Sequence, residues 1–243
     1  MWFGILLACI NPENTQSDSS CNEPTDSNGD GFSSCEEEAD PNLDSDGDGY
    51  SDLEEEECNS DPYDSTDACY ACGWPHGDPG GMISTGSTEG SIIANLVFVD
   101  QCGETVKLWD FADGYNVLYM TAQWCGACAQ EVGDLSDKAD RFEDLYGFPV
   151  RYLIGIFEDN DSLTPEPEVA EAFAERTEMS RFPVLADVQG QLLESTPYDG
   201  NQLPGKCALS PEMEILGCAT GSAAEEYVFA LIVEHSLSKD LSK

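Results

Sequence analysis

Two cysteines with two residues between them, Cys125 and Cys128, stand in the segment TAQWCGACAQE, residues 121–131. Such a pair can form a structural disulfide, supply half of a zinc site, or act as a dithiol that exchanges disulfides. No second pair with this spacing follows it and no histidine lies near it in the sequence, whereas a zinc site needs four ligands. We therefore interpret the pair as a redox-active dithiol.

The flanking residues predict a position in which a thiolate would be stabilised. The apolar run NVLYMTA, residues 116–122, is typical of a buried strand. Apolar residues then recur at helical spacing from Val132 to Leu145, which predicts a helix. A cysteine at this junction points its sulfur at the unpaired N–H groups of the helix N-terminus. We expect Cys125 to be the exposed attacking thiolate and Cys128, one turn later, to be the resolving thiol.

Strands and helices alternate from about Ile92 onwards. A β-hairpin is predicted for NLVFVDQCGETVKL, with its turn at Cys102 and Gly103. Then come a strand VRYLIGIF, a helix EVAEAFAERT, a short strand FPVLAD, a hairpin KCALSPEMEILG and a helix AAEEYVFALIVEHSL. This order predicts an α/β sandwich.

The motif WCGAC after a buried strand resembles the thioredoxin superfamily, and CAQE after it resembles the exported TlpA/ResA-type thiol–disulfide oxidoreductases of the redoxin group. The resemblance covers about residues 85–240 and implies a thioredoxin-like three-layer sandwich. It also implies that Glu131 lies beneath the dithiol and assists proton transfer. Because a buried carboxyl resists ionisation, we expect the pKa of Glu131 to be raised. In QLPGKCALSPEMEIL it implies that Pro204 is the cis-proline facing the cysteines, with Pro183 as a competing candidate. Ala127 and Gly133 stand where the family often has proline.

Other cysteines are candidates for structural disulfides. Cys207 and Cys218 flank the predicted hairpin turn at Pro211 and are expected to pair across it. A zinc site formed by Cys58, Cys69, Cys72 and His76 stays open as the less favoured alternative to oxidation. The pairing of the remaining cysteines stays open as well; they are Cys21, Cys35, Cys58, Cys69, Cys72 and Cys102.

Two acidic segments, DSNGDGFSSCEE from Asp26 and DSDGDGYSDLEE from Asp44, share one pattern. Oxygen-bearing side chains at positions 1, 3 and 5, glycine at 6 and glutamate at 12 have the spacing that wraps a calcium ion. The expected ligands are Asp26, Asn28, Asp30, Glu37 and the carbonyl of Phe32, then Asp44, Asp46, Asp48, Asp52, Glu55 and the carbonyl of Tyr50. The segment resembles thrombospondin type 3 repeats over about residues 26–67, which implies a calcium-stiffened stalk of little regular secondary structure. A solvated acidic linker is the alternative.

The charge and the cysteine content limit the setting. A net charge of −40 argues against a nucleic-acid partner, which would need clustered lysine and arginine. Eleven cysteines favour an oxidising, exported environment. The sequence Leu6-Leu7-Ala8-Cys9 has the form of a bacterial lipobox, so lipid attachment at Cys9 is expected, although no basic residue precedes it.

These features predict four regions: a lipoprotein-type signal at 1–9, a flexible tether at 10–25, an acidic calcium-binding segment at 26–78 and a thioredoxin-like domain at 79–243. The predicted protein is a lipoprotein of the bacterial cell envelope. It would exchange disulfides with envelope proteins and with a membrane or periplasmic redox partner. Structural calcium and no organic cofactor are expected.

Three other function classes are alternatives to a disulfide oxidoreductase. A thiol peroxidase would show Pro-x-x-x-Thr-x-x-Cys, but Ala122 stands three residues before Cys125 and Thr121 one further back. A copper-delivery protein would need a longer cysteine spacing and a distal histidine, and His235 is expected to be a surface residue. The third alternative is a non-catalytic calcium-stiffened surface module. The direction of electron flow stays open.

Overall fold

The computed structural model describes residues 43–46, 51–58, 60–63, 71–74, 81–112, 114–221 and 223–240 of the 243-residue chain. Its first half contains α1 (Asp52–Cys58), β1 (Val97–Asp100), β2 (Thr105–Lys107), the 3-10 helix η1 (Leu108–Phe111), β3 (Asn116–Ala122) and α2 (Gly126–Gly133). Its second half contains α3 (Leu135–Tyr146), β4 (Arg151–Glu158), α4 (Glu168–Thr177), β5 (Val184–Ala186), β6 (Gly205–Leu209), β7 (Ile215–Thr220) and α5 (Ala224–Asp240).

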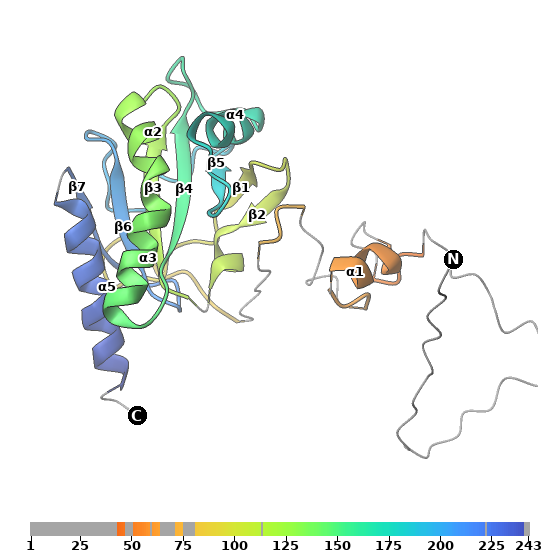
Figure 1. Cartoon of the computed structure of the whole chain (residues 1–243), viewed down its shortest axis with the longest axis horizontal. Helices are drawn as coiled ribbons and strands as arrows, with labels where there is room; N and C mark the ends of the chain where they lie inside the picture. Colours follow the sequence, from red (N-terminus) through yellow and green to blue (C-terminus); the bar gives the residue numbers. More distant parts are fainter. Residues whose placement is uncertain are drawn as a thin grey trace, which may run out of the picture. The chain divides into compact units, whose positions relative to one another are not determined.

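Seven strands form one mixed sheet in the order β2-β1-β5-β4-β3-β6-β7 (Figure 1). Strands β3, β4 and β5 are parallel, and β1 and β6 join them in antiparallel pairs. Because β3 lies between β4 and β6, every one of its seven residues is buried. The end of β3 is therefore a rigid point from which a loop can project.

The two faces of the sheet are covered differently. On the face of Val117 and Tyr119, buried residues of α2, α3, α4 and α5 pack into one apolar cluster. On the face of Leu118 and Met120, the cover consists of residues 93–96, η1 and the segment 192–198. The chain thus has the expected α/β layers and a thioredoxin-like fold, with α-helices on one face and mostly irregular segments on the other.

The helix predicted across Val132 to Leu145 is wrong as a single element. Helix α2 ends at Gly133, and the N–H of Asp134 bonds to the carbonyl of Glu131. Glycine is a weak helix former, so the break falls at a favourable place. Helix α3 then starts at Leu135, and Leu145 near its end is 76% exposed rather than packed in the core.

A short segment before the sheet, residues 71–74, is tied to the β1–β2 hairpin. Cys72 forms a disulfide with Cys102 in the hairpin turn. The indole N–H of Trp74 donates to the Asp100 carboxylate at 2.7 Å, and the amide of Ala71 donates to the Glu104 carboxylate at 2.8 Å. Cys72 is therefore bound to sulfur rather than held in the alternative zinc site.

Candidate active site

The dithiol lies where β3 passes into α2, as the sequence predicts. Cys125 is the N-cap of α2, and its sulfur accepts the backbone N–H of Cys128 at 3.3 Å. The two sulfurs are joined in a disulfide. Cys125 is 8% exposed and Cys128 is 0% exposed. A reagent can therefore reach the sulfur of Cys125 first, while Cys128 lies beneath it.

The loop that carries Cys125 is held from two sides. The guanidinium of Arg176 on α4 donates to the carbonyl of Gln123 at 2.7 Å. The indole N–H of Trp124 donates to the Glu158 carboxylate, at the end of β4, at 2.9 Å. The Trp124 side chain stays 49% exposed beside the dithiol. The sequence signal for this position was the tryptophan before the first cysteine, but its partner Glu158 could not be read from spacing.

Pro204 lies opposite the end of β3. The Leu203–Pro204 peptide is cis, and among the described residues no peptide at Pro183 is cis. Gly205, the next residue, pairs with Met120 of β3. The antiparallel register therefore brings Pro204 level with the last residues of β3, from which the dithiol loop starts.

Glu131 belongs to a network of charges rather than to an isolated acid. Its Oε1 accepts hydrogen bonds from the ammonium groups of Lys138 and Lys206, and each Nζ lies 2.6 Å from that oxygen. The hydroxyl of Tyr119 lies 3.4 Å from its Oε2. Lys206 and Lys138 also contact Glu225, whose other partner is the hydroxyl of Tyr152.

The raised pKa expected for Glu131 is wrong. Burial alone would raise it, but the hydrogen bonds from Lys138 and Lys206 outweigh burial and hold the pKa of the carboxyl below its ordinary value. For Tyr119, burial and then the neighbouring Glu131 raise the pKa of the hydroxyl far above its ordinary value. Tyr119 is thus a permanent hydrogen-bond donor.

Part of the predicted second calcium loop is described. The Asp52 carboxylate accepts the amide and the hydroxyl of Ser45, each at 2.8 Å, and the amide of Asp52 donates to the carbonyl of Leu43. Glu55, on helix α1, is buried, and its carboxylate accepts a hydrogen bond from the hydroxyl of Ser60. Asp44 and Asp46 precede this closure. The other predicted positions lie outside the described residues; they are Cys9, Asp26, Asn28, Asp30, Phe32, Glu37, Asp48 and Tyr50.

The predicted pair Cys207–Cys218 is a disulfide between β6 and β7, with the two residues directly opposite in register. Cys207 points to the sheet face opposite Tyr119, in the cluster of Leu118 and Met120. It is therefore separated by the sheet from the dithiol, whose cysteines pack with Tyr119.

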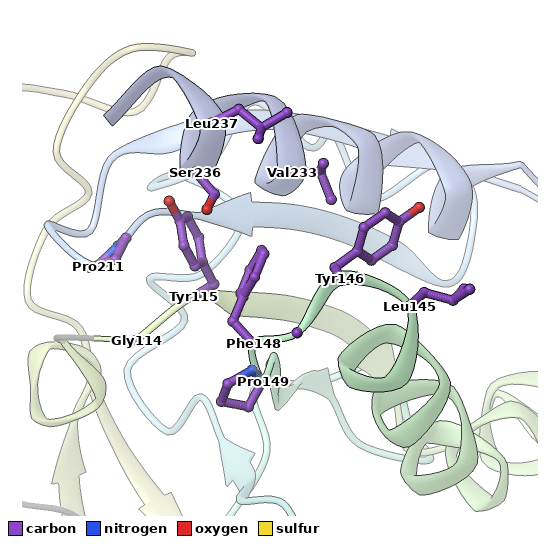
Figure 2. Close-up of a pocket in the computed structure, with 11 residues that line it drawn as sticks. Gly114, Tyr115, Leu145, Tyr146, Phe148, Pro149, Pro211, Val233, Ser236 and Leu237 are labelled. Carbon is purple, nitrogen blue, oxygen red and sulfur yellow. The ribbon is translucent and has the colours of Figure 1, made fainter. Parts of the chain in front are cut away.

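A cavity of about 730 Å³ lies at the other end of β3 (Figure 2). It is lined by Tyr115 before β3, by Phe148 and Pro149 after α3, and by Leu237 of α5. His235 contributes to this end through a 2.9 Å contact between its Nδ1 and the Tyr115 hydroxyl, so it is not simply a surface residue. β3 extends roughly 20 Å between this cavity and the dithiol, which makes them separate features.

No helix in the described part of the chain is long and apolar enough to cross a bilayer.

The chain is similar to one family model and to several solved structures. Residues 90–210 match the model of the AhpC/TSA family. No curated protein matches the chain. Peroxidoxin BcpB from Mycobacterium tuberculosis is 19% identical, with a TM-score of 0.48 over 60% of this chain and 96% of that one. The thioredoxin domain of a thiol-disulfide oxidoreductase from Bacteroides vulgatus is 22% identical, with a TM-score of 0.44 over 59% of this chain and 97% of that one. Residues 90–210 are thus similar to the AhpC/TSA family, and the dithiol at the β3–α2 junction lies within the matched segment.

Proposed function

We propose that this protein is an exported thiol–disulfide oxidoreductase that exchanges disulfides with other proteins through Cys125 and Cys128. The observation that carries the proposal is the placement of Cys125 as the N-cap of α2 above a fully buried Cys128. The N-terminus of α2 offers N–H donors and a positive potential to a thiolate at Cys125.

The reaction then proceeds in two exchanges. The Cys125 thiolate attacks a substrate disulfide, forming a mixed disulfide and releasing one substrate sulfur as thiolate. Cys128 loses its proton, with Glu131 as the acceptor, and its thiolate attacks the sulfur of Cys125. The bond from Cys125 to the substrate breaks and the second substrate sulfur leaves with the electron pair. Two electrons pass to the substrate, and the Cys125–Cys128 disulfide remains; the reverse sequence oxidises a substrate.

Trapping tests this assignment. Cys128→Ser retains attack and loses release, so it should accumulate mixed disulfides at Cys125 with substrate proteins. Cys125→Ser should accumulate none. Alkylation of the reduced protein across pH gives an independent measure, because the thiol with the lower pKa reacts first as pH rises. A faster reaction at Cys128 than at Cys125 would reverse the roles.

The same purified protein distinguishes other functions. Rapid, Cys125-dependent consumption of peroxide, with no reduction of insulin disulfides, would make it a peroxidase. Absence of both activities would leave a non-catalytic module. The potential of the dithiol gives the direction of transfer: a value near about −270 mV favours a reductase and one near about −120 mV an oxidase.

We propose in addition that the acidic segment binds structural calcium. The fit rests on the spacing of Asp44, Asp46, Asp52 and Glu55, the last of which is a fully buried carboxylate on α1. Calorimetry on the full chain should show calcium binding that is weakened by Glu55→Gln. Unchanged binding in that variant would remove Glu55 from the ligand set.

For location we propose a bacterial envelope lipoprotein anchored through Cys9. Support comes from the disulfides Cys72–Cys102 and Cys207–Cys218, which persist in oxidising compartments. Cys9→Ser should release the protein from the membrane fraction of its native host. Continued sedimentation with membranes would refute the anchor.

A further inference from the structure

Four charged side chains from four elements meet beneath α2. Glu131 of α2 contacts Lys138 of α3 and Lys206 of β6, each at 2.6 Å, and both lysines also contact Glu225 of α5. The two ammonium groups thus alternate with the two carboxylates around a closed ring. The ring carries no net charge when all four groups are ionised.

Lys206 is the innermost member of this ring. Its side chain is 2% exposed on a strand whose five residues are all buried, and its Nζ also lies 5.5 Å from the centroid of the Tyr119 ring. Burying an ion pair costs several kcal/mol per ion by desolvation, so apolar residues often stabilise such a position as well or better. Stability alone therefore does not explain why a lysine occupies this buried position.

The ring is connected to the dithiol through α2. Glu131 follows Cys128 by three residues, which places both on one face of the helix. The hydroxyl of Tyr119 lies 3.2 Å from the carbonyl of Cys128 and 3.4 Å from Glu131 Oε2. The Glu131 carboxylate is therefore fixed close to the turn of helix that carries the buried thiol.

The ring also reaches water. Glu131, Lys138 and Glu225 line a groove of about 540 Å³ between α3 and α5, which lie side by side (Figure 1). Cys128, in contrast, has no exposed surface. The groups that face Glu131, Glu225 or this groove are Tyr119 of β3, Lys138, Arg141 and Tyr146 of α3, Tyr152 of β4, Lys206 of β6, and Glu225 and Glu226 of α5.

We infer that Lys206, anchored by Glu225, is a positioning residue of the dithiol reaction: it fixes the Glu131 carboxylate under α2 and keeps it ionised. Glu131 then accepts the proton of Cys128 only transiently and passes it to water in the groove, instead of storing it. In that step the S–H bond of Cys128 breaks, the proton moves to Glu131 and then to water, and the electron pair stays on sulfur for attack on Cys125.

The inference rests on the proposed function, and pH profiles test it. The measured quantity is the rate of substrate release from a preformed mixed disulfide at Cys125, from pH 4 to 8. For the natural protein, release should be nearly independent of pH over the middle of this range. In Lys206→Met, which keeps the length and removes the charge, Glu131 loses a hydrogen-bonded cation, and the acidic limb should move up by about 1–3 pH units.

Matched variants separate positioning from structure. Lys239, near the end of α5, forms an ion pair with Glu212 away from the ring. Lys239→Met should leave the pH profile of substrate release unchanged. Adding Glu131→Gln to Lys206→Met should abolish the shifted limb, because the titrating group is gone. Lys138→Met should shift the limb in the same direction, and it replaces Lys206→Met if that variant does not fold.

The outcomes are distinct. If the natural protein releases substrate and the Lys206→Met or Lys138→Met profile matches it, the inference is wrong while the proposed function stands. The inference also fails if the shifted limb persists without the Glu131 carboxylate. If the natural protein forms no mixed disulfide at all, the proposed function itself fails.

Discussion

Replacing Gly205 with alanine probes the close packing between β6 and the segment that carries Pro204. A Cβ added at Gly205 would stand 2.7–2.8 Å from three ring atoms of Tyr198. Ordinary contact begins at about 3.4 Å, so the ring would have to retreat by roughly 0.6 Å. Tyr198 is 5% exposed, packs edge-on to Phe157, and donates its hydroxyl to the carbonyl of Gln202 at 2.7 Å. The ring therefore has little room to move.

The expected cost follows from these contacts. Overpacking of this size costs about 1–3 kcal/mol. Restricting the unfolded chain with alanine recovers about 0.4–1 kcal/mol. A net loss of about 1–2 kcal/mol remains, which lowers the melting temperature of a domain this size by about 2–8 °C. Since Gly205 pairs with Met120 near the end of β3, from which the dithiol loop starts, mixed-disulfide formation should also slow.

Thermal unfolding of the oxidised protein, followed by circular dichroism, measures the change. Gly133→Ala is the matched control, because nothing lies within 4 Å of its added Cβ and the position is helical, so stability should rise by about 0.5–1 kcal/mol. Tyr198→Leu combined with Gly205→Ala should show coupling, since the smaller side chain removes the clash. Purely additive effects, or a Gly205→Ala protein as stable as the natural one, would refute the reasoning.

Three further predictions concern stability. Replacing Cys72 and Cys102 with serine should lower the free energy of unfolding by roughly 3.6 kcal/mol, from the loop entropy of a 30-residue separation. Replacing Cys207 and Cys218 should cost roughly 2.8 kcal/mol in loop entropy for a separation of 11 residues; denaturant melts that rank the two pairs in the reverse order would argue against this account. Because the folded pKa of Glu131 lies below its ordinary value of 4.5, its ionisation stabilises the protein above that pH and the gain is lost as pH falls through the folded pKa. Glu131→Gln should therefore reduce the loss of stability below about pH 4.5, measured by urea unfolding.

The sequence predicted best those elements whose pattern lies within a single segment of the chain. The strand predicted for residues 116–122 is β3, with the predicted bounds. The helix predicted for EVAEAFAERT is α4. Both signals are local: a continuous apolar run for a central strand and an amphipathic period for a surface helix. The break between α2 and α3 was missed because apolar spacing continues across Asp134, where the structure ends one helix and starts the next.

The charged ring could not be predicted from spacing. Lysine in a short strand is usually interpreted as facing solvent, yet the antiparallel register turns Lys206 toward Tyr119. Its carboxylate partners lie 75 and 19 residues away in the sequence. The disulfide from Cys72 to Cys102 was equally inaccessible, because eleven cysteines allow many connectivities and spacing does not select among them.

The ring also determines how charge at this site acts on the redox potential. The two ammonium groups and the two carboxylates of the natural ring balance, and the N-terminus of α2 adds a positive potential at the dithiol. Lys206→Met leaves a net negative charge near Cys128, which destabilises a thiolate in the reduced protein and makes the potential more negative. Glu225→Gln leaves a net positive charge and shifts the potential the other way. General loosening of the structure gives no reason for the redox potentials of the two variants to shift in opposite directions. Equilibrating both variants with glutathione therefore distinguishes an electrostatic effect from damage to the fold. Shifts of the same sign would refute the electrostatic account.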